Sequence, residues 1–137
     1  MSWTCPDCKR SFGRKNQSHG CAPSGTVDDY FATRPAVLRK TFDAVARHLM
    51  KRDDVHIDAV TVCVMFKRER SFAEVRAKRD RLDLWFLLSR TVDDPRIHRA
   101  LKLSAHRTAH VVQLMRPADV DRDVREWLSE AYASSPT

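Results

Sequence analysis

Hydrophobic residues recur with a helical period in the stretch that follows residue 33. The apolar stripe consists of Leu38, Phe42, Val45 and Leu49. This spacing predicts an amphipathic helix over residues 34–52, with Thr33 as its N-cap and Pro35 in its first turn. Upstream, Thr26 and Asp29 have the spacing of a capping pair, which predicts a short helical turn before the longer helix.

The pattern then changes to the alternation that is typical of strands. Four strands are predicted, over residues 60–66, 72–76, 82–88 and 110–116. The third has an apolar set on one face, at Leu82, Leu84, Phe86 and Leu88. The sequence VDDPR at 92–96 marks a turn, and a last apolar stripe predicts a helix over residues 117–133.

The order of these elements predicts an α+β fold. The connections between consecutive strands are too short for helical crossovers, so the sheet of about four strands should be largely antiparallel. Both helices are expected on one face of this sheet. The opposite face would be partly open and, depending on the strand register, would show residues such as Arg76, Asp83, Trp85 and His110.

The amino-terminal segment, residues 1–25, has a different character. It contains the sequence CPDCKRSFGRKNQSHGC, in which four side chains have the spacing C-x2-C-x10-H-x-C. These are Cys5, Cys8, His19 and Cys21. Two ligand pairs of this kind suit the tetrahedral coordination of Zn²⁺. The sequence therefore predicts a zinc-knuckle-like segment, followed by an α+β domain over residues 26–137.

Other interpretations of the cysteines are weaker. A disulfide is disfavoured in a reducing cytosol, and a thioredoxin-like redox pair needs a βαβ context that does not follow. A metal-free fold has only Trp3 and Phe12 as large apolar groups within residues 1–21, which is too little to offset the entropy of ordering the chain. Because four protein ligands leave no open coordination position, the zinc ion is expected to be structural.

The charge of the chain indicates a polyanionic partner. The 137 residues have a net charge of +7. Residues 66–81 hold seven basic and three acidic side chains, and residues 5–21 hold four basic and one acidic. Nucleic acid is the commonest polyanion, although a solvated basic surface would give the same charge. The sequence has no run of 18 apolar residues and no signal-peptide pattern, so a cytoplasmic protein that does not enter a membrane is expected.

Basic residues in several segments are candidates for phosphate contacts. They are Lys9, Arg10, Arg14, Lys15, Arg68, Arg76 and Arg96. If Arg76 and Trp85 share the open face of the sheet, they form a platform on which bases can stack. The alternative is that each charge is simply solvated and that Trp85 belongs to the core.

A second candidate site is the sequence SAHRTAH, which brings His106, Arg107 and His110 close together. Such a group could bind phosphate or perform acid–base chemistry, since histidine titrates near neutrality. The alternative is a set of surface polar groups, because no nucleophile or carboxylate is spaced to complete a catalytic constellation. No catalytic residue is therefore predicted, and Cys63 is expected to be an inert buried thiol.

Two stretches of the sequence are distinctive. The first is the cysteine-rich segment, which includes Asn16 through His19. The second is FAEVRAKRDRLDLWFLLSRTVDDPRIHR, together with the later SAHRTAH. Together they resemble a bacterial family of uncharacterised proteins in which a Cys/His knuckle precedes a domain of unknown function. The domain is also similar to small YdhG/YjbR-like domains. The resemblance implies an α+β fold, gives some support to nucleic-acid binding and supplies no mechanism.

Three functions are compatible with these observations. The leading hypothesis is a non-enzymatic module that binds DNA or RNA through its phosphates, with Zn²⁺ as a structural cofactor. The second is an enzyme that uses His106, His110 and nearby arginines on a phosphorylated or acidic substrate, which requires those side chains to meet in a concave pocket. The third is a module that binds a partner protein, which an exposed apolar patch on the open sheet face would favour.

Overall fold

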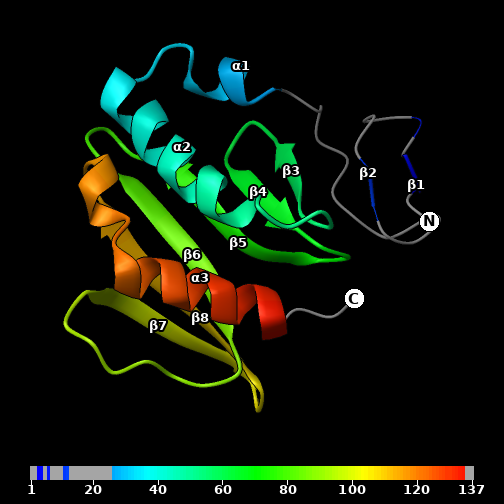
Figure 1. Ribbon diagram of the computed structural model, residues 1–137, viewed down its shortest axis with the longest axis vertical. Helices are drawn as coiled ribbons and strands as arrows, with labels where there is room; N and C mark the ends of the chain where they lie inside the picture. Colours follow the sequence, from blue (N-terminus) through cyan, green and yellow to red (C-terminus); the bar gives the residue numbers. More distant parts are fainter. Residues whose placement is uncertain (1–2, 5, 7–10, 13–25, 135–137) are drawn as a thin grey trace.

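The computed structural model describes residues 3–4, 6, 11–12 and 26–134. Its main element is a six-stranded antiparallel sheet with the strand order β3-β4-β5-β6-β8-β7 (Figure 1). The strands are β3 (His56–Ala59), β4 (Val64–Lys67), β5 (Ser71–Ala77), β6 (Leu82–Leu88), β7 (Ile97–Ser104) and β8 (Arg107–Leu114). Two short strands, β1 (Trp3–Thr4) and β2 (Ser11–Phe12), form a separate antiparallel pair.

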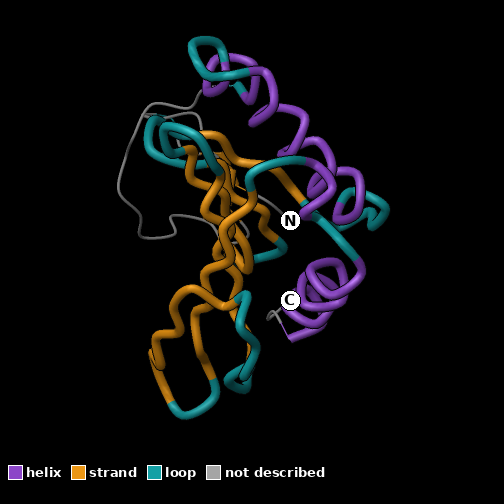
Figure 2. Tube along the Cα trace, turned by 90° about the vertical axis from the view of Figure 1, so that its left-hand side faces the viewer, coloured by secondary structure: helices purple, strands orange, loops and turns teal. Residues whose placement is uncertain are grey.

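The described α-helices lie on one face of the large sheet, as the sequence predicted (Figure 2). They are α1 (Val27–Phe31), α2 (Ala36–Leu49) and α3 (Arg122–Ser134), and a 3-10 turn, η1 (Pro117–Asp119), precedes α3. The predicted capping pair is confirmed, because Thr26 Oγ1 accepts the N–H of Asp29 and the Asp29 carboxylate accepts the N–H of Thr26. The fold class, α+β with a carboxyl-terminal helix, is therefore as expected.

We call the helix-facing side of the sheet the covered face, and it holds the core. The predicted stripe of α2 and the alternate positions of β6 meet there and are almost fully buried. Phe42 of α2 stacks on Phe66 of β4 with ring centres 5.6 Å apart, and Trp127 of α3 stacks on Phe86 of β6 at 5.9 Å. Burial of these large apolar groups is the main source of stability in such a layer.

The prediction of about four strands is wrong, because the sheet has six. The segment predicted as one strand over 60–66 contains the turn of a hairpin, in which β3 ends at Ala59 and β4 begins at Val64. The other missed strand, β7, lies at the sheet edge and most of its residues are exposed, so it lacks the apolar alternation of the inner strands. Two register shifts also interrupt its pairing with β8, between Ile97 and Arg99 and between Lys102 and Ser104.

None of the described helices covers the opposite side of the sheet, which we call the open face. Arg76, Asp83 and Trp85 lie on it, because each alternates with a buried core residue of its strand. His110 does not, and this expectation was wrong. The register of β6 with β8 places His110 directly opposite Phe86, so both side chains point into the core. No described helix is both long enough and apolar enough to cross a lipid bilayer.

Candidate functional site on the open sheet face

Three neighbouring strands bring a group of side chains together at the centre of the open face. Trp85 of β6 lies opposite Glu74 of β5 on one side and Val111 of β8 on the other. One step along β6 on the same face, Leu87 lies opposite Ala109 of β8. Directly paired residues are close neighbours on their face of a sheet, so these five side chains form one continuous surface.

A cavity of about 290 Å³ opens above this surface. Trp85, Leu87 and Ala109 line it, together with Leu101 and Leu103 of β7. The small side chain of Ala109 leaves room between β6 and the leucines of β7. The polar lining comes from β5, at Ser71, Glu74 and Arg76. An apolar hollow with a few polar groups on one side is the usual composition of a small-ligand site, and the volume is near the lower end of the range for such sites.

Arg76 is held at the rim of this cavity. Its Nε donates to Oε2 of Glu74 at 2.8 Å, and its Cζ lies 5.2 Å from the centre of the Trp85 ring system. The hydrogen bond to Glu74 is the main reason that the pKa of Arg76 is raised. Arg76 is thus paired with a carboxylate and also makes a cation–π contact that restrains the indole ring of Trp85.

The indole N–H of Trp85 is buried, and no acceptor among the described residues receives it. Buried donors are nearly always hydrogen-bonded, because an unsatisfied one costs about 1–3 kcal/mol. Trp85 lines the cavity, so a ligand bound there contacts its ring system.

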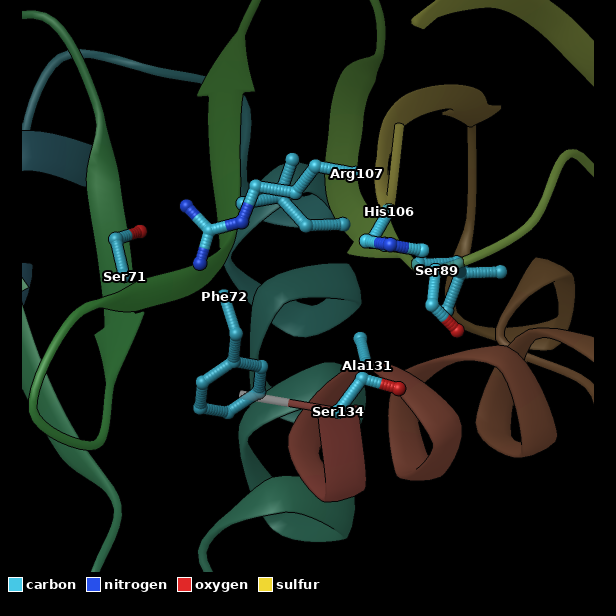
Figure 3. A pocket seen from close by; sticks show the side chains of 9 residues that line it. Ser71, Phe72, Ser89, His106, Arg107, Ala131 and Ser134 are labelled. Carbon is cyan, nitrogen blue, oxygen red and sulfur yellow. The ribbon is translucent and has the colours of Figure 1, made fainter. Parts of the chain in front are cut away.

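The hairpin of β7 and β8 adds positive charge beside the cavity. Arg99 lies opposite Val111, in the same cross-strand row as Trp85. Arg107 begins β8 and lines a second, smaller cavity with His106 (Figure 3). Within the described ranges, neither Arg99 nor Arg107 forms an ion pair with a carboxylate.

Arg68 and Arg96 have other roles. Arg68 Nε donates to Asp54 Oδ2 at 3.0 Å, and its Nη1 donates to the carbonyl oxygen of Tyr132 near the end of α3. Arg96 forms an ion pair with Asp121 and donates to the carbonyl of residue 119, and this pairing lowers the pKa of the Asp121 carboxyl. The structure therefore gives Arg68, Arg76 and Arg96 separate partners and does not gather them into one groove.

The structure does not bring His106 and His110 of SAHRTAH together. His110 is fully buried, its ring stacks on Phe86 at 5.3 Å, and its Nε2 accepts the N–H of Val92 at 3.0 Å. Burial is the main reason that the pKa of His110 is lowered. His106 is exposed in the turn between β7 and β8 and remains close to Arg107 at the smaller cavity.

The amino-terminal candidates lie outside the described residues. They are the zinc ligands Cys5, Cys8, His19 and Cys21 and the basic residues Lys9, Arg10, Arg14 and Lys15. Among the residues that the structure does describe, no group of three or more histidine, cysteine, aspartate or glutamate side chains is placed to hold a metal ion. Cys63 is buried and free, and burial raises the pKa of its thiol to about 12, which makes it the unreactive thiol that the sequence indicated.

The sequence interpretation missed the leucines of β7 and the role of Ala109. A signal for the leucines is present, since Leu101 and Leu103 alternate with the polar residues Lys102 and Ser104. Nothing in the sequence marks Ala109, because its importance depends on which residue it faces across the sheet.

Comparison with known proteins gives one match. A family model described as "Domain of unknown function (DUF5655)" matches residues 27–135. No curated protein and no solved structure matches the chain. The matched range covers the sheet and the three α-helices, which agrees with the resemblance to a domain of unknown function, and it does not include the cysteine-rich segment.

Proposed function

We propose a function from the site itself, because the chain belongs to the DUF5655 family and the description of that family supplies no activity to transfer. The proposal is that the open face of the sheet binds single-stranded nucleic acid, DNA or RNA, without catalysis. A base enters the cavity beside Trp85, and the cations of the β7–β8 hairpin contact the phosphates. The observation that carries the proposal is the cavity itself, which is lined by the Trp85 ring and by an arginine that contacts it.

The chemistry of the cavity suits a nucleobase. A base is a flat ring, so it can pack against the side chains of Trp85 and Leu87 that line the cavity. Contacts between an aromatic side chain and a base contribute about 1–3 kcal/mol each and require an unpaired base. Carboxylate oxygens of Glu74 at the same cavity can accept from exocyclic amines, which gives the site a means to prefer some bases.

The distribution of charge supports a chain of phosphates more than an isolated neutral ligand. The protein carries a net charge of +7. Arg76 is already paired with Glu74, so the phosphate contacts are assigned to Arg99 and Arg107, which have no carboxylate partner among the described residues. Lysine and arginine contacts of this kind release counterions and make affinity depend on salt.

The test is the binding of a fluorescent oligonucleotide, single-stranded or duplex, measured by anisotropy at several salt concentrations. We expect the single strand to bind more tightly, and Trp85→Ala to weaken that binding by about 1–3 kcal/mol. Arg99→Gln should lower the slope of log affinity against log salt by about 0.7, the value for one phosphate contact on a single strand.

Arg47→Gln is the matched control, since it removes the same charge from an exposed position on α2, away from the open face. It should leave the salt slope closer to that of the original protein than Arg99→Gln does. Equal binding of the Trp85→Ala variant, or no binding of the single strand at low salt, would contradict the proposal.

A structural Zn²⁺ ion at Cys5, Cys8, His19 and Cys21 is a separate part of the proposal, and its support is the spacing of the four ligands in the sequence. Elemental analysis of the purified protein should find one zinc ion per chain, and Cys8→Ser should lose it. The open face is formed by other residues, so oligonucleotide binding through Trp85 should persist in that variant. Protein purified without zinc and unable to take it up would refute this part.

A further inference from the structure

A second cavity lies at the end of the sheet, next to the cavity of the proposed base site. Its volume is about 30 Å³, roughly twice the space that one water molecule needs, so a base cannot enter it. The two cavities share three lining residues, Ser71, Phe72 and Leu87, and are therefore neighbours. A single ligand can occupy both if it carries a small polar group next to a ring.

The lining of the small cavity is suited to an anion. Figure 3 shows the Arg107 side chain extending from β8 toward Ser71 and Phe72, with His106 and Ser89 on the other side of the cavity. No aspartate or glutamate is among the described residues that line it. Within the part of the chain that the structure describes, no ion pair or hydrogen bond occupies the Arg107 guanidinium, so its donors are available to a ligand.

The far wall of the cavity comes from α3, through Ala131 and Ser134. Ser134 ends this helix, and the carboxyl-terminal end of a helix carries partial negative charge. The helix therefore opposes an anion, and Arg107, supported by His106 and the serine hydroxyls, has to supply the attraction. The half-buried position of Arg107 strengthens such a contact, because it is less screened by water than a contact at a fully exposed arginine.

We propose that the small cavity binds the terminal phosphate of a nucleotide whose base occupies the larger cavity. This inference rests on the proposed function and makes it more specific. The phosphate is a terminal one, a phosphomonoester, because a group with a single ester link can be enclosed on its other sides by β5, β6, β8 and α3. An internal phosphodiester carries a second ester link, so it cannot be enclosed in the same way.

The experiment compares oligonucleotides of one sequence that carry a 5′-phosphate, a 3′-phosphate or no terminal phosphate, with binding measured by anisotropy and calorimetry. The protein should prefer one phosphorylated end by about tenfold or more, the effect of charge-assisted hydrogen bonds to one group. Arg107→Gln should abolish this preference, so that the phosphorylated and unphosphorylated strands bind equally. Arg47→Gln, the matched control on α2, should keep the preference.

A second pair of variants distinguishes loss of the phosphate site from a folding defect caused by Arg107→Gln. Ser89 is exposed and lines the cavity, and Ser89→Asp places a negative charge where the phosphate would bind. It should reverse or remove the preference for the phosphorylated end, whereas Ser89→Ala should retain most of it.

The outcomes separate the two proposals. Equal binding of phosphorylated and unphosphorylated strands would refute the phosphate site and leave the base site standing. Absence of binding to every strand would refute both. A preference that survives Arg107→Gln, or an Arg107→Gln variant that only lowers stability, would show that Arg107 compensates the end of α3 and binds no phosphate.

Discussion

The two faces of the large sheet are built from the same strands and have opposite properties. On the covered face, the alternate residues of β6 are at most 1% exposed and pack against the helices. On the open face, Trp85 and Leu87 of the same strand are half-buried and border a cavity of about 290 Å³. The comparison teaches that one strand can serve two purposes with its two sets of side chains: one set stabilises the domain and the other shapes a site.

Each face of the sheet holds a buried nitrogen that has no hydrogen-bond partner among the described residues. On the covered face, it is Nδ1 of His110, whose Nε2 accepts the N–H of Val92. On the open face, it is Nε1 of Trp85. Such a group costs stability on either face, and the two differ in their surroundings: His110 stacks on Phe86 in the core, whereas Trp85 lines the cavity of about 290 Å³.

The largest expected effect is on stability, and it tests the division between the faces. Phe86→Ala leaves a cavity beneath Trp127 and His110, and it should lower the free energy of unfolding by about 3–5 kcal/mol. Trp85→Ala, one residue earlier and on the other face, should lower it by only about 1 kcal/mol. Chemical denaturation of both variants measures this contrast. Similar losses would mean that the open face is a second core.

A smaller effect concerns the buried histidine of the covered face. Burial holds the pKa of His110 below its ordinary value of about 6.5 in the folded state, so the unfolded chain takes up the proton first as the pH falls. The stability that neutral His110 contributes is therefore complete above about pH 6.5 and is lost below it, by at most about 1.4 kcal/mol per pH unit.

The measurement for His110 is the free energy of unfolding as a function of pH. His110→Gln should flatten the decline below about pH 6.5, while His48→Gln should leave the contribution of His110 in place. His48 is a suitable comparison, because burial lowers its pKa as well and it lies between α2 and α3, where it contacts Ser129. An unchanged decline in His110→Gln would contradict this account.

The local parts of the fold could be predicted from sequence, and the non-local parts could not. The stripe of α2, the capping pair at Thr26 and the alternation in β6 are visible because each depends on neighbours a few residues away. The β3–β4 hairpin was missed because its turn contains Thr61 and Val62 and has no glycine, proline or asparagine to mark it. The edge strand β7 was missed because an exposed strand needs no apolar pattern.

The same distinction holds for the site. The proximity of Arg76 and Trp85 on the open face could be anticipated from the alternation of two neighbouring strands. The hollow above Ala109 depends on the β6–β8 register, and the partners of Arg68 and Arg96 come from distant segments, at Asp54 and Asp121. Sequence spacing also suggested that His106 and His110 act together, but His106 lies in the exposed turn before β8 and His110 is buried in the core.

The irregular pairing of β7 has a consequence for the behaviour of the protein in concentrated solution. An outermost strand offers free backbone groups to any other strand that approaches, and this is a common route to aggregation. Here the ladder is broken by two register shifts, and the exposed cations Arg99 and Lys102 lie between them. A second molecule would therefore meet an irregular, positively charged strand, so we expect the β7 edge to resist strand-to-strand assembly.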